Sequence, residues 1–145
     1  MSTDTNNDQR LRVLLADDHP TNRAVVEVIL AIIEADLVSV EDGAQAVAAF
    51  KAGVFDVILM DLQMPVMDGL TAIREIRRLE REGGQTRTPI LAVTANAMSE
   101  HVAASRAAGA DDHLAKPVVA ETLIEAIYNA TDVAAAGLDD QALAS

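Results

Sequence analysis

The sequence predicts an α/β fold built on a doubly wound, five-stranded parallel sheet with helices on both faces. Five short apolar runs of strand length alternate along the chain with five segments of helical periodicity. This alternation is typical of strand–helix units joined by right-handed crossovers. The first, third, fourth and fifth runs lead into charged or hydroxyl side chains. Because the carboxyl ends of parallel strands share one edge of the sheet, we expect these side chains to meet there.

The first strand and helix are expected at residues 13–16 and 20–34. The run from Val13 to Ala16 is unbroken, as in a strand buried on both faces. Proline suits the first turn of a helix, which places the helix start at Pro20. Apolar residues then recur at helical spacing: Ala24, Val25, Val28, Ile29, Ile32 and Ile33. This set must contain the core-facing side, and the sequence leaves open which members face outward.

The second strand, residues 37–40, alternates between apolar and polar side chains, as a strand exposed on one side does. It is the least apolar of the five runs, so we expect it at an edge of the sheet. After a turn at Gly43, residues 44–51 are expected to form a helix with three apolar side chains inward: Ala46, Val47 and Phe50.

The third strand, residues 57–60, consists of four apolar residues that run directly into Asp61. The helix that follows is expected to end at Gly83-Gly84. Its apolar face is predicted to hold Leu70, Ile73 and Ile76, against a basic face of Arg74, Arg77 and Arg78.

The fourth and fifth strands, residues 89–93 and 113–115, lead to Thr94 and Lys116. An alanine-rich helix between them is expected to run to Gly109, which fits a left-handed cap. The last helix is defined by its apolar residues Leu123, Ile124 and Ile127. With the second strand at an edge, the order 2-1-3-4-5 is a consistent assignment for a doubly wound sheet.

The composition indicates a single domain that does not bind nucleic acids or anionic membranes. The 145 residues carry a net charge of −12, from 23 acidic against 11 basic residues, and include no cysteine. A strongly acidic surface disfavours nucleic acids and anionic membranes. We expect a polar, disordered lead-in at residues 1–10, the domain at 11–130 and an alanine-rich tail or linker at 131–145. The N-terminus lacks signal-peptide features, so a cytoplasmic location without membrane insertion is expected.

The side chains expected at the shared sheet edge are Asp17, Asp18, Asp61, Thr94 and Lys116. Three carboxylates form a hard oxygen site of the kind that Mg²⁺ prefers, and one lysine reduces their charge to −2, which a divalent cation neutralises. A carboxylate beside a cation and a lysine can attack phosphorus as a nucleophile. Judged from residues 57–65 alone, Asp61 fits a residue that begins a turn at least as well as it fits a site residue. The coincidence of all five side chains therefore carries the prediction of a site.

Four motifs lie at these strand ends: Asp17-Asp18, residues 60–69 with the sequence MDLQMPVMDG, Thr94-Ala95 and Lys116-Pro117. Together they resemble the receiver domain of bacterial two-component response regulators, over residues 11–130. The resemblance implies a flavodoxin-like fold. It implies a signalling domain, not an enzyme, that assists its own phosphorylation and dephosphorylation.

The resemblance also implies a role for each site residue. Asp61 is implied to accept a phosphoryl group from a phosphohistidine. Asp18 and Asp61 are implied to bind Mg²⁺, or Mn²⁺ as an alternative, with the backbone carbonyl of Gln63, and Asp17 to act through water.

Thr94 and Lys116 are implied to hold the phosphoryl group, and the bond before Pro117 is implied to be cis. Gln63 and Asn96 flank the expected path of hydrolytic water and are implied to tune the lifetime of the phosphate.

The sequences of residues 17–23, 94–98 and 109–117 are similar to those of receivers in hybrid sensor histidine kinases or in phosphorelays. The implied partner is a histidine kinase or a histidine phosphotransfer protein. A stand-alone regulator and a C-terminal receiver cut from a hybrid kinase both stay open. A homodimer through the last two helices also stays open.

Two positions depart from the family pattern. His113 stands where the family usually has Tyr or Phe, whose ring moves inward together with the Thr94 hydroxyl. A surface packing role and a switch biased by protonation fit His113 about equally. The connection at Glu34, between the first helix and the second strand, lacks the glycine that the family often has there. The other histidines, His19 and His101, are interpreted as solvated helix residues.

Three rival classes use similar residues. An aspartate-nucleophile phosphatase typically places a second aspartate two residues after the nucleophile, where this chain has Gln63. A flavin- or dinucleotide-binding domain needs a phosphate loop after the first strand, where Asp17-Asp18 would repel a phosphate. A receiver-shaped module that never takes phosphate is the third alternative, although every residue needed is present.

Overall fold

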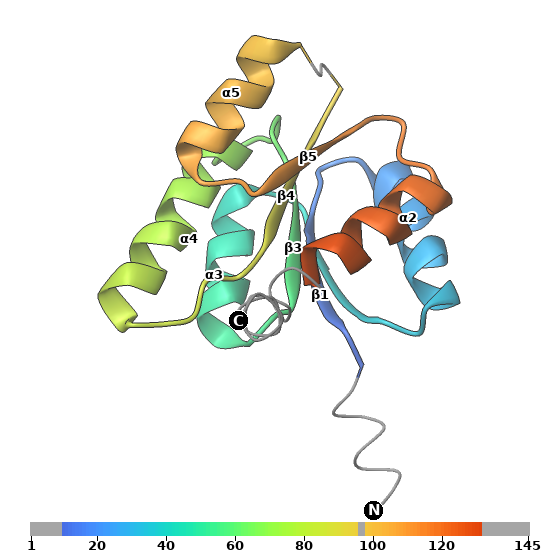
Figure 1. Cartoon of the computed structure of the whole chain (residues 1–145), viewed down its shortest axis with the longest axis horizontal. Coiled ribbons are helices and arrows are strands. Elements are labelled where there is room, and N and C mark those ends of the chain that lie inside the picture. The colour runs from blue at the N-terminus through green and yellow to red at the C-terminus, as the bar shows by residue number, and fades with distance from the viewer. Residues whose placement is uncertain (1–9, 96–97, 132–145) are drawn as a thin grey trace, which may run out of the picture.

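The computed structural model describes residues 10–95 and 98–131, and within them the predicted α/β architecture is confirmed (Figure 1). Five parallel strands form one sheet in the order β2-β1-β3-β4-β5. The strands are β1 (Arg12–Ala16), β2 (Asp36–Val40), β3 (Val57–Asp61), β4 (Ile90–Thr94) and β5 (Asp112–Ala115). The helices are α2 (Pro20–Ile32), α3 (Gly43–Ala52), α4 (Gly69–Gly83), α5 (Ser99–Ala108) and, after β5, the helix formed by residues 120–131. The edge position of β2 agrees with its alternating sequence.

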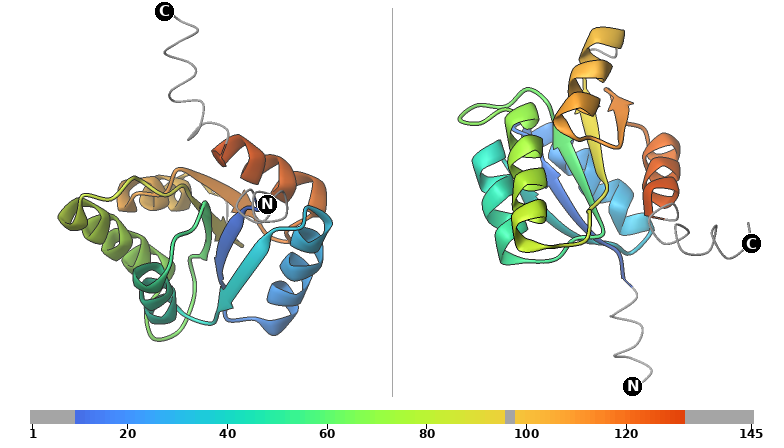
Figure 2. Two further views of the ribbon diagram at one scale, coloured as in Figure 1. Left: turned by 90° about the horizontal axis from the view of Figure 1, so that it is seen from below. Right: turned by 60° about the vertical axis from the view of Figure 1, so that its left-hand side comes forward.

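Helices cover both faces of the sheet (Figure 2). On one face α3, α4 and α5 enclose a cluster that includes Leu14 and Ile58, and on the other face α2 and helix 120–131 enclose a cluster that includes Val13 and Leu59. Successive residues of a strand point to opposite faces, so a strand with helices on both sides is buried along its whole length. All residues of β3 and β4 are buried in this way. The central strand β3 therefore delivers Asp61 to the edge of the sheet from inside the core.

Helix α2 divides its apolar residues between two faces, a division that the sequence left open. Val26, Ile29 and Leu30 are buried against the sheet. Four residues of the predicted set face solvent and are here called the α2 stripe: Ala24, Val25, Val28 and Ile32. Because the helix is apolar around most of its circumference, helical spacing alone does not select the buried side.

Arg77 on α4 is buried, which contradicts its predicted place on a basic outer face. Its side chain is 6% exposed. The guanidinium donates to Glu80 Oε1 and Asp111 Oδ2, both at 2.8 Å, and to the carbonyl oxygens of Thr88 at 2.8 Å and Gly109 at 2.9 Å. These bonds join α4 to the segments that enter β4 and β5, at the end of the sheet opposite Asp61.

Two helix ends show how the backbone reverses. Gly109, predicted as a cap, has a φ of 122°, and a Cβ there would come within 2.7 Å of Arg77 Cγ. Glu34, at the join where the sequence lacks a glycine, has a φ of 55°. For a residue other than glycine, this left-handed region raises the conformational energy by about 1–2 kcal/mol. The chain after α2 is therefore held in a conformation that glycine would adopt more easily.

Three predictions fall partly or wholly outside the described residues: the lead-in at 1–9, Asn96, and the tail at 132–145. Within the ranges 10–95 and 98–131, none of the helices has the length and apolar character that crossing a membrane requires.

Candidate functional site

Asp61 ends β3 and lies buried at the carboxyl edge of the sheet. The residue is 2% exposed. Its two carboxylate oxygens have different partners: the Gln63 backbone N–H donates to Oδ1 at 3.1 Å, and Lys116 Nζ donates to Oδ2 at 3.0 Å. The side chain is thus oriented by one neutral and one charged donor.

Burial raises the pKa of the Asp61 carboxyl above its ordinary value. The hydrogen bonds from Gln63 and Lys116 and the charge of Lys116 act in the opposite direction, and the negative charge of Asp17 adds to the increase. The ionised carboxylate is therefore incompletely compensated by its protein neighbours. A cation at this edge would supply the missing compensation.

The segment after β1 brings two more carboxylates to the same place. Asp17 is 3% exposed, with Oδ1 accepting the His19 N–H at 2.9 Å and Oδ2 lying 3.5 Å from Lys116 Nζ. Lys116 therefore contacts both Asp17 and Asp61. The Oδ1 atom of Asp18 is buried and makes no hydrogen bond within the described residues, although His19 Nδ1 lies 3.0 Å away.

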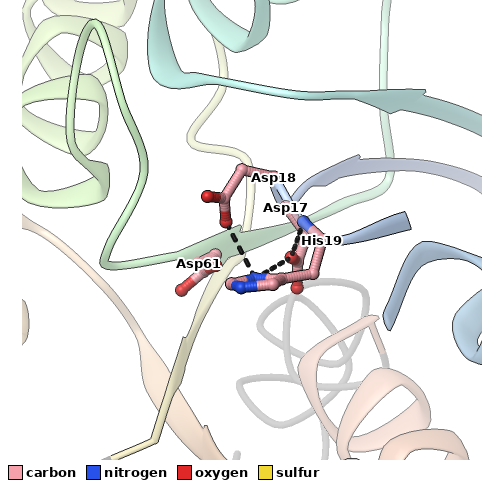
Figure 3. A group of neighbouring side chains, drawn as sticks. All are labelled: Asp17, Asp18, His19 and Asp61. Carbon is pink, nitrogen blue, oxygen red and sulfur yellow. Dashed lines mark hydrogen bonds and ion pairs between the residues drawn. The ribbon is translucent and has the colours of Figure 1, made fainter. Parts of the chain in front are cut away.

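The resulting group can hold a metal ion (Figure 3). Ligand atoms of Asp17, Asp18, His19 and Asp61 all lie within 4.8 Å of one another. Three carboxylate donors suit a hard divalent cation, and the unpaired Asp18 Oδ1 is an acceptor that such a cation would satisfy. The sequence predicted that the three aspartates meet. It did not predict His19 among them.

Thr94 and Lys116 complete the group from the other side. Thr94 ends β4 and is 6% exposed. Its carbonyl accepts the Lys116 N–H at 2.9 Å, which continues the pairing of β4 and β5 to the edge of the sheet. The Lys116–Pro117 peptide bond is cis. All five side chains that the sequence assigned to one edge do lie there.

Helix α4 begins close against the end of β3. The Gly69 N–H donates to the Leu62 carbonyl at 3.1 Å, and a Cβ on Gly69 would collide with the Asp61 carbonyl oxygen. Asp68 caps the helix by accepting the Thr71 N–H at 2.8 Å. The Asp68-Gly69 pair therefore fixes the helix start and permits its close approach to Asp61.

Two further predicted residues, Gln63 and His113, lie at the margin of this group. The Gln63 side chain is exposed, while its N–H binds Asp61. His113 lies on β5 opposite Ala92. Its Nδ1 is buried without a hydrogen bond in the described part of the chain, 3.7 Å from Asp112 Oδ1. Asn96 is not among the described residues.

Arg23 is a supporting residue that the sequence did not reveal. Its Nη1 donates to the Asp17 carbonyl at 2.7 Å. A signal was present, since Arg23 follows the acidic pair within the first turn of a predicted helix, and that turn must pack beside the segment it leaves. This bond holds the backbone of Asp17 in place.

A doubly wound sheet of this order, with an acidic group, a threonine and a lysine at the carboxyl edge of its strands, defines a receiver-type domain. The chain belongs to the response regulator receiver domain family, whose model matches residues 13–128.

Known relatives agree with this assignment. The chain is 41% identical over 123 residues to the sensor protein GacS of Pseudomonas syringae pv. syringae, covering 85% of this chain and 14% of GacS. It is 36% identical to the magnesium-bound receiver domain of the sensor histidine kinase PA1611 of Pseudomonas aeruginosa PAO1, with a TM-score of 0.75 over 84% of this chain and 98% of that one. The receiver domain of Saccharomyces cerevisiae Ssk1, solved with the phosphotransfer protein Ypd1, gives a TM-score of 0.82 at 28% identity over 86% and 90% of the two chains. The chain thus spans about one seventh of the curated relative GacS.

Proposed function

We propose that this domain receives a phosphoryl group on Asp61 in a histidine-to-aspartate phosphorelay. The observation that carries the proposal is the position of Lys116, 3.0 Å from Asp61 and 3.5 Å from Asp17. The Lys116 ammonium thus offsets two buried carboxylates and leaves Asp61 Oδ1, which among the described residues accepts only the Gln63 N–H, as the candidate attacking atom.

In the proposed step an Asp61 carboxylate oxygen forms a bond to phosphorus while the bond from phosphorus to the donor's imidazole nitrogen breaks. The electron pair of that bond returns to the imidazole, which leaves as neutral histidine after taking up a proton. Lys116 and the Thr94 hydroxyl would hold the phosphoryl oxygens. Hydrolysis of the product would restore Asp61, with Gln63 and Asn96 tuning its rate.

The proposed cofactor is Mg²⁺, with Mn²⁺ as an alternative. Asp18, Asp61 and the Gln63 carbonyl would bind it directly, and Asp17 through water. When bound, the cation would neutralise charge on the phosphoryl oxygens as they approach the carboxylates. The magnesium-bound PA1611 receiver, at 36% identity, supports this choice.

The proposed donor is a histidine phosphotransfer protein or histidine kinase that docks on the α2 stripe. Val28 and Ile32, at 67% and 65% exposure, present apolar surface on the helix that follows the acidic pair. A small pocket of about 60 Å³ lies between α2 and the segment after Lys116, lined in part by Val25 and Val118. The complex of the related Ssk1 receiver with Ypd1 supports a partner of this class.

We further propose a cytoplasmic setting and a phosphorylation-dependent switch involving Thr94 and His113, with α5 and helix 120–131 as its output and as a homodimer surface. Both a stand-alone regulator and a hybrid kinase could contain such a domain. The similarity to GacS favours the hybrid kinase, because the matched part is one domain of a sensor protein.

The test is phosphorylation by a small donor. Wild type treated with acetyl phosphate and Mg²⁺ is expected to gain one phosphoryl group by intact mass, and Asp61→Asn none. Asp36→Asn is the matched control, because Asp36 lies at the opposite end of the sheet with a 51% exposed side chain, and it should behave as wild type. An unmodified wild type, or equal labelling of Asp61→Asn, would refute the proposal.

A further inference from the structure

We propose that His19 is a metal ligand of this site, and that its imidazole strengthens the binding of later divalent transition ions such as Co²⁺ and Zn²⁺ relative to Mg²⁺ and Mn²⁺. The inference rests on the proposed function in one respect, since both use the same cation site. It concerns which ions the site accepts and which residue sets that choice.

The spacing of the donor atoms carries the inference. His19 Nδ1 lies 3.0 Å from Asp18 Oδ1 and 3.6 Å from Asp17 Oδ1. Two ligands about 2.1 Å from one ion and at right angles to each other lie about 3 Å apart. The 3.0 Å separation is therefore that of two neighbouring ligands of a single ion. Figure 3 shows the imidazole nitrogen turned toward the aspartates.

The Asp18 oxygen beside His19 supports a shared ion over a direct bond. Asp18 Oδ1 is buried, and the contact with Nδ1 is short, yet the geometry of this pair is not that of a hydrogen bond. An oxygen and a nitrogen that face a common ion need no mutual alignment. The backbone is already fixed, because the His19 N–H donates to Asp17 Oδ1 at 2.9 Å.

The exposure of His19 also leaves room for its ring to bind a metal. The side chain is 64% exposed, so its second ring nitrogen can carry a proton into solvent while Nδ1 faces the site. No backbone movement is needed to recruit it, because Nδ1 already lies 3.0 Å from Asp18 Oδ1.

The chemistry of the imidazole sets the ion preference. Carboxylate oxygens suit Mg²⁺, whereas an imidazole nitrogen strengthens binding of later transition ions in the Irving–Williams order. Three carboxylates alone would favour hard ions. Adding His19 gives a mixed set of oxygen and nitrogen donors, so Co²⁺ and Zn²⁺ should gain much more from His19 than Mg²⁺ does.

Pulsed electron paramagnetic resonance of the Mn²⁺-loaded protein tests the coordination directly. Wild type is expected to show ¹⁴N modulation from a bound imidazole, and His19→Ala is expected to lose it. His101→Ala is the matched control, since His101 on α5 is outside the group of four ligands and its removal should leave the modulation intact. His19→Gln, which keeps a side chain of similar size, serves as a second variant if His19→Ala folds poorly.

Calorimetric titration tests the ion preference. His19→Ala should bind Co²⁺ at least about tenfold more weakly than wild type, because the loss of even an outer-shell partner of a metal ligand costs about 10–100-fold in affinity, with a smaller change for Mg²⁺. Wild type without ¹⁴N modulation, or modulation that persists in both His19 variants, would overturn the inference, as would equal losses for Co²⁺ and Mg²⁺. Those results would leave His19 as an ion-pair partner of Asp18 and leave phosphorylation of Asp61 intact. A wild type that Mg²⁺ and acetyl phosphate fail to modify would instead overturn the proposed function.

Discussion

Replacing Arg77 by alanine is expected to cost far more stability than replacing its neighbour Arg78, although each arginine pairs with two carboxylates. The Arg77 side chain is 6% exposed and that of Arg78 is 44% exposed. Without Arg77, the buried Glu80 carboxylate keeps, within the described part of the chain, only the Thr88 N–H, at 2.7 Å. Asp111 keeps Arg87 and the Ile90 N–H. Removal of Arg77 therefore leaves mainly the Glu80 carboxylate without compensation.

Removing one partner of a buried ion pair costs about 3–5 kcal/mol, because the other charge stays buried without compensation. Two carbonyl oxygens also lose a charged donor, so we expect Arg77→Ala to lower the free energy of unfolding by about 4 kcal/mol. With a urea m-value of about 2 kcal/mol/M, this loss lowers the unfolding midpoint by about 2 M. Arg78→Ala should shift the midpoint little, since solvent screens its pairs with Glu75 and Glu82.

Urea denaturation followed by far-ultraviolet circular dichroism measures both variants. Arg77→Lys, which keeps the charge but cannot donate to four acceptors at once, should fall between wild type and Arg77→Ala. Adding Glu80→Gln to Arg77→Ala should recover part of the loss by removing the uncompensated charge. Equal midpoint shifts for Arg77→Ala and Arg78→Ala would refute the burial reasoning, and a double variant without recovery would assign the loss to packing.

Three further predictions concern the site, a backbone turn and the docking surface. Because the pKa of Asp61 is raised in the fold, its contribution to stability is present below the ordinary aspartate pKa and is lost as the pH rises through the raised value. Without divalent cations, Asp61→Asn should therefore be more stable than wild type at pH 7, and this gain should vanish in acid; a gain independent of pH would contradict the sign. Glu34→Gly should raise the free energy of unfolding by about 0.5–1 kcal/mol by relieving the positive φ, and a destabilised variant would count against that strain. Val28→Asp should slow phosphorylation by a phosphotransfer protein but not by acetyl phosphate. Val54→Asp is the control, because Val54 is also exposed, at 78% against 67% for Val28; equal slowing by both donors would argue against docking on α2.

The strands and the aspartate group were predictable from the sequence because both depend on short-range pattern and topology. An unbroken apolar run such as that of β3 specifies burial on both faces, and the parallel order then brings Asp17, Asp61, Thr94 and Lys116 to one edge. Neither step needs knowledge of side-chain partners.

What the sequence did not predict depends on partners that come from elsewhere in the chain. Arg77 looked like a surface residue because helical spacing says nothing of Gly109, 32 positions away, whose carbonyl it binds. The core face of α2 was ambiguous because apolar residues surround most of the helix. His19 looked solvated, and only the folded chain places its ring nitrogen beside Asp18.

The two faces of α2 also bear on how such a domain can change. Val26, Ile29 and Leu30 hold the helix on the sheet, while Val25, Val28 and Ile32 take almost no part in the core. Mutations in the outer three can accumulate at little cost in stability. If the donor docks on α2 as proposed, duplicated copies can diversify this surface while every copy still folds, and the choice of signalling partner can then evolve separately from the fold that supports Asp61.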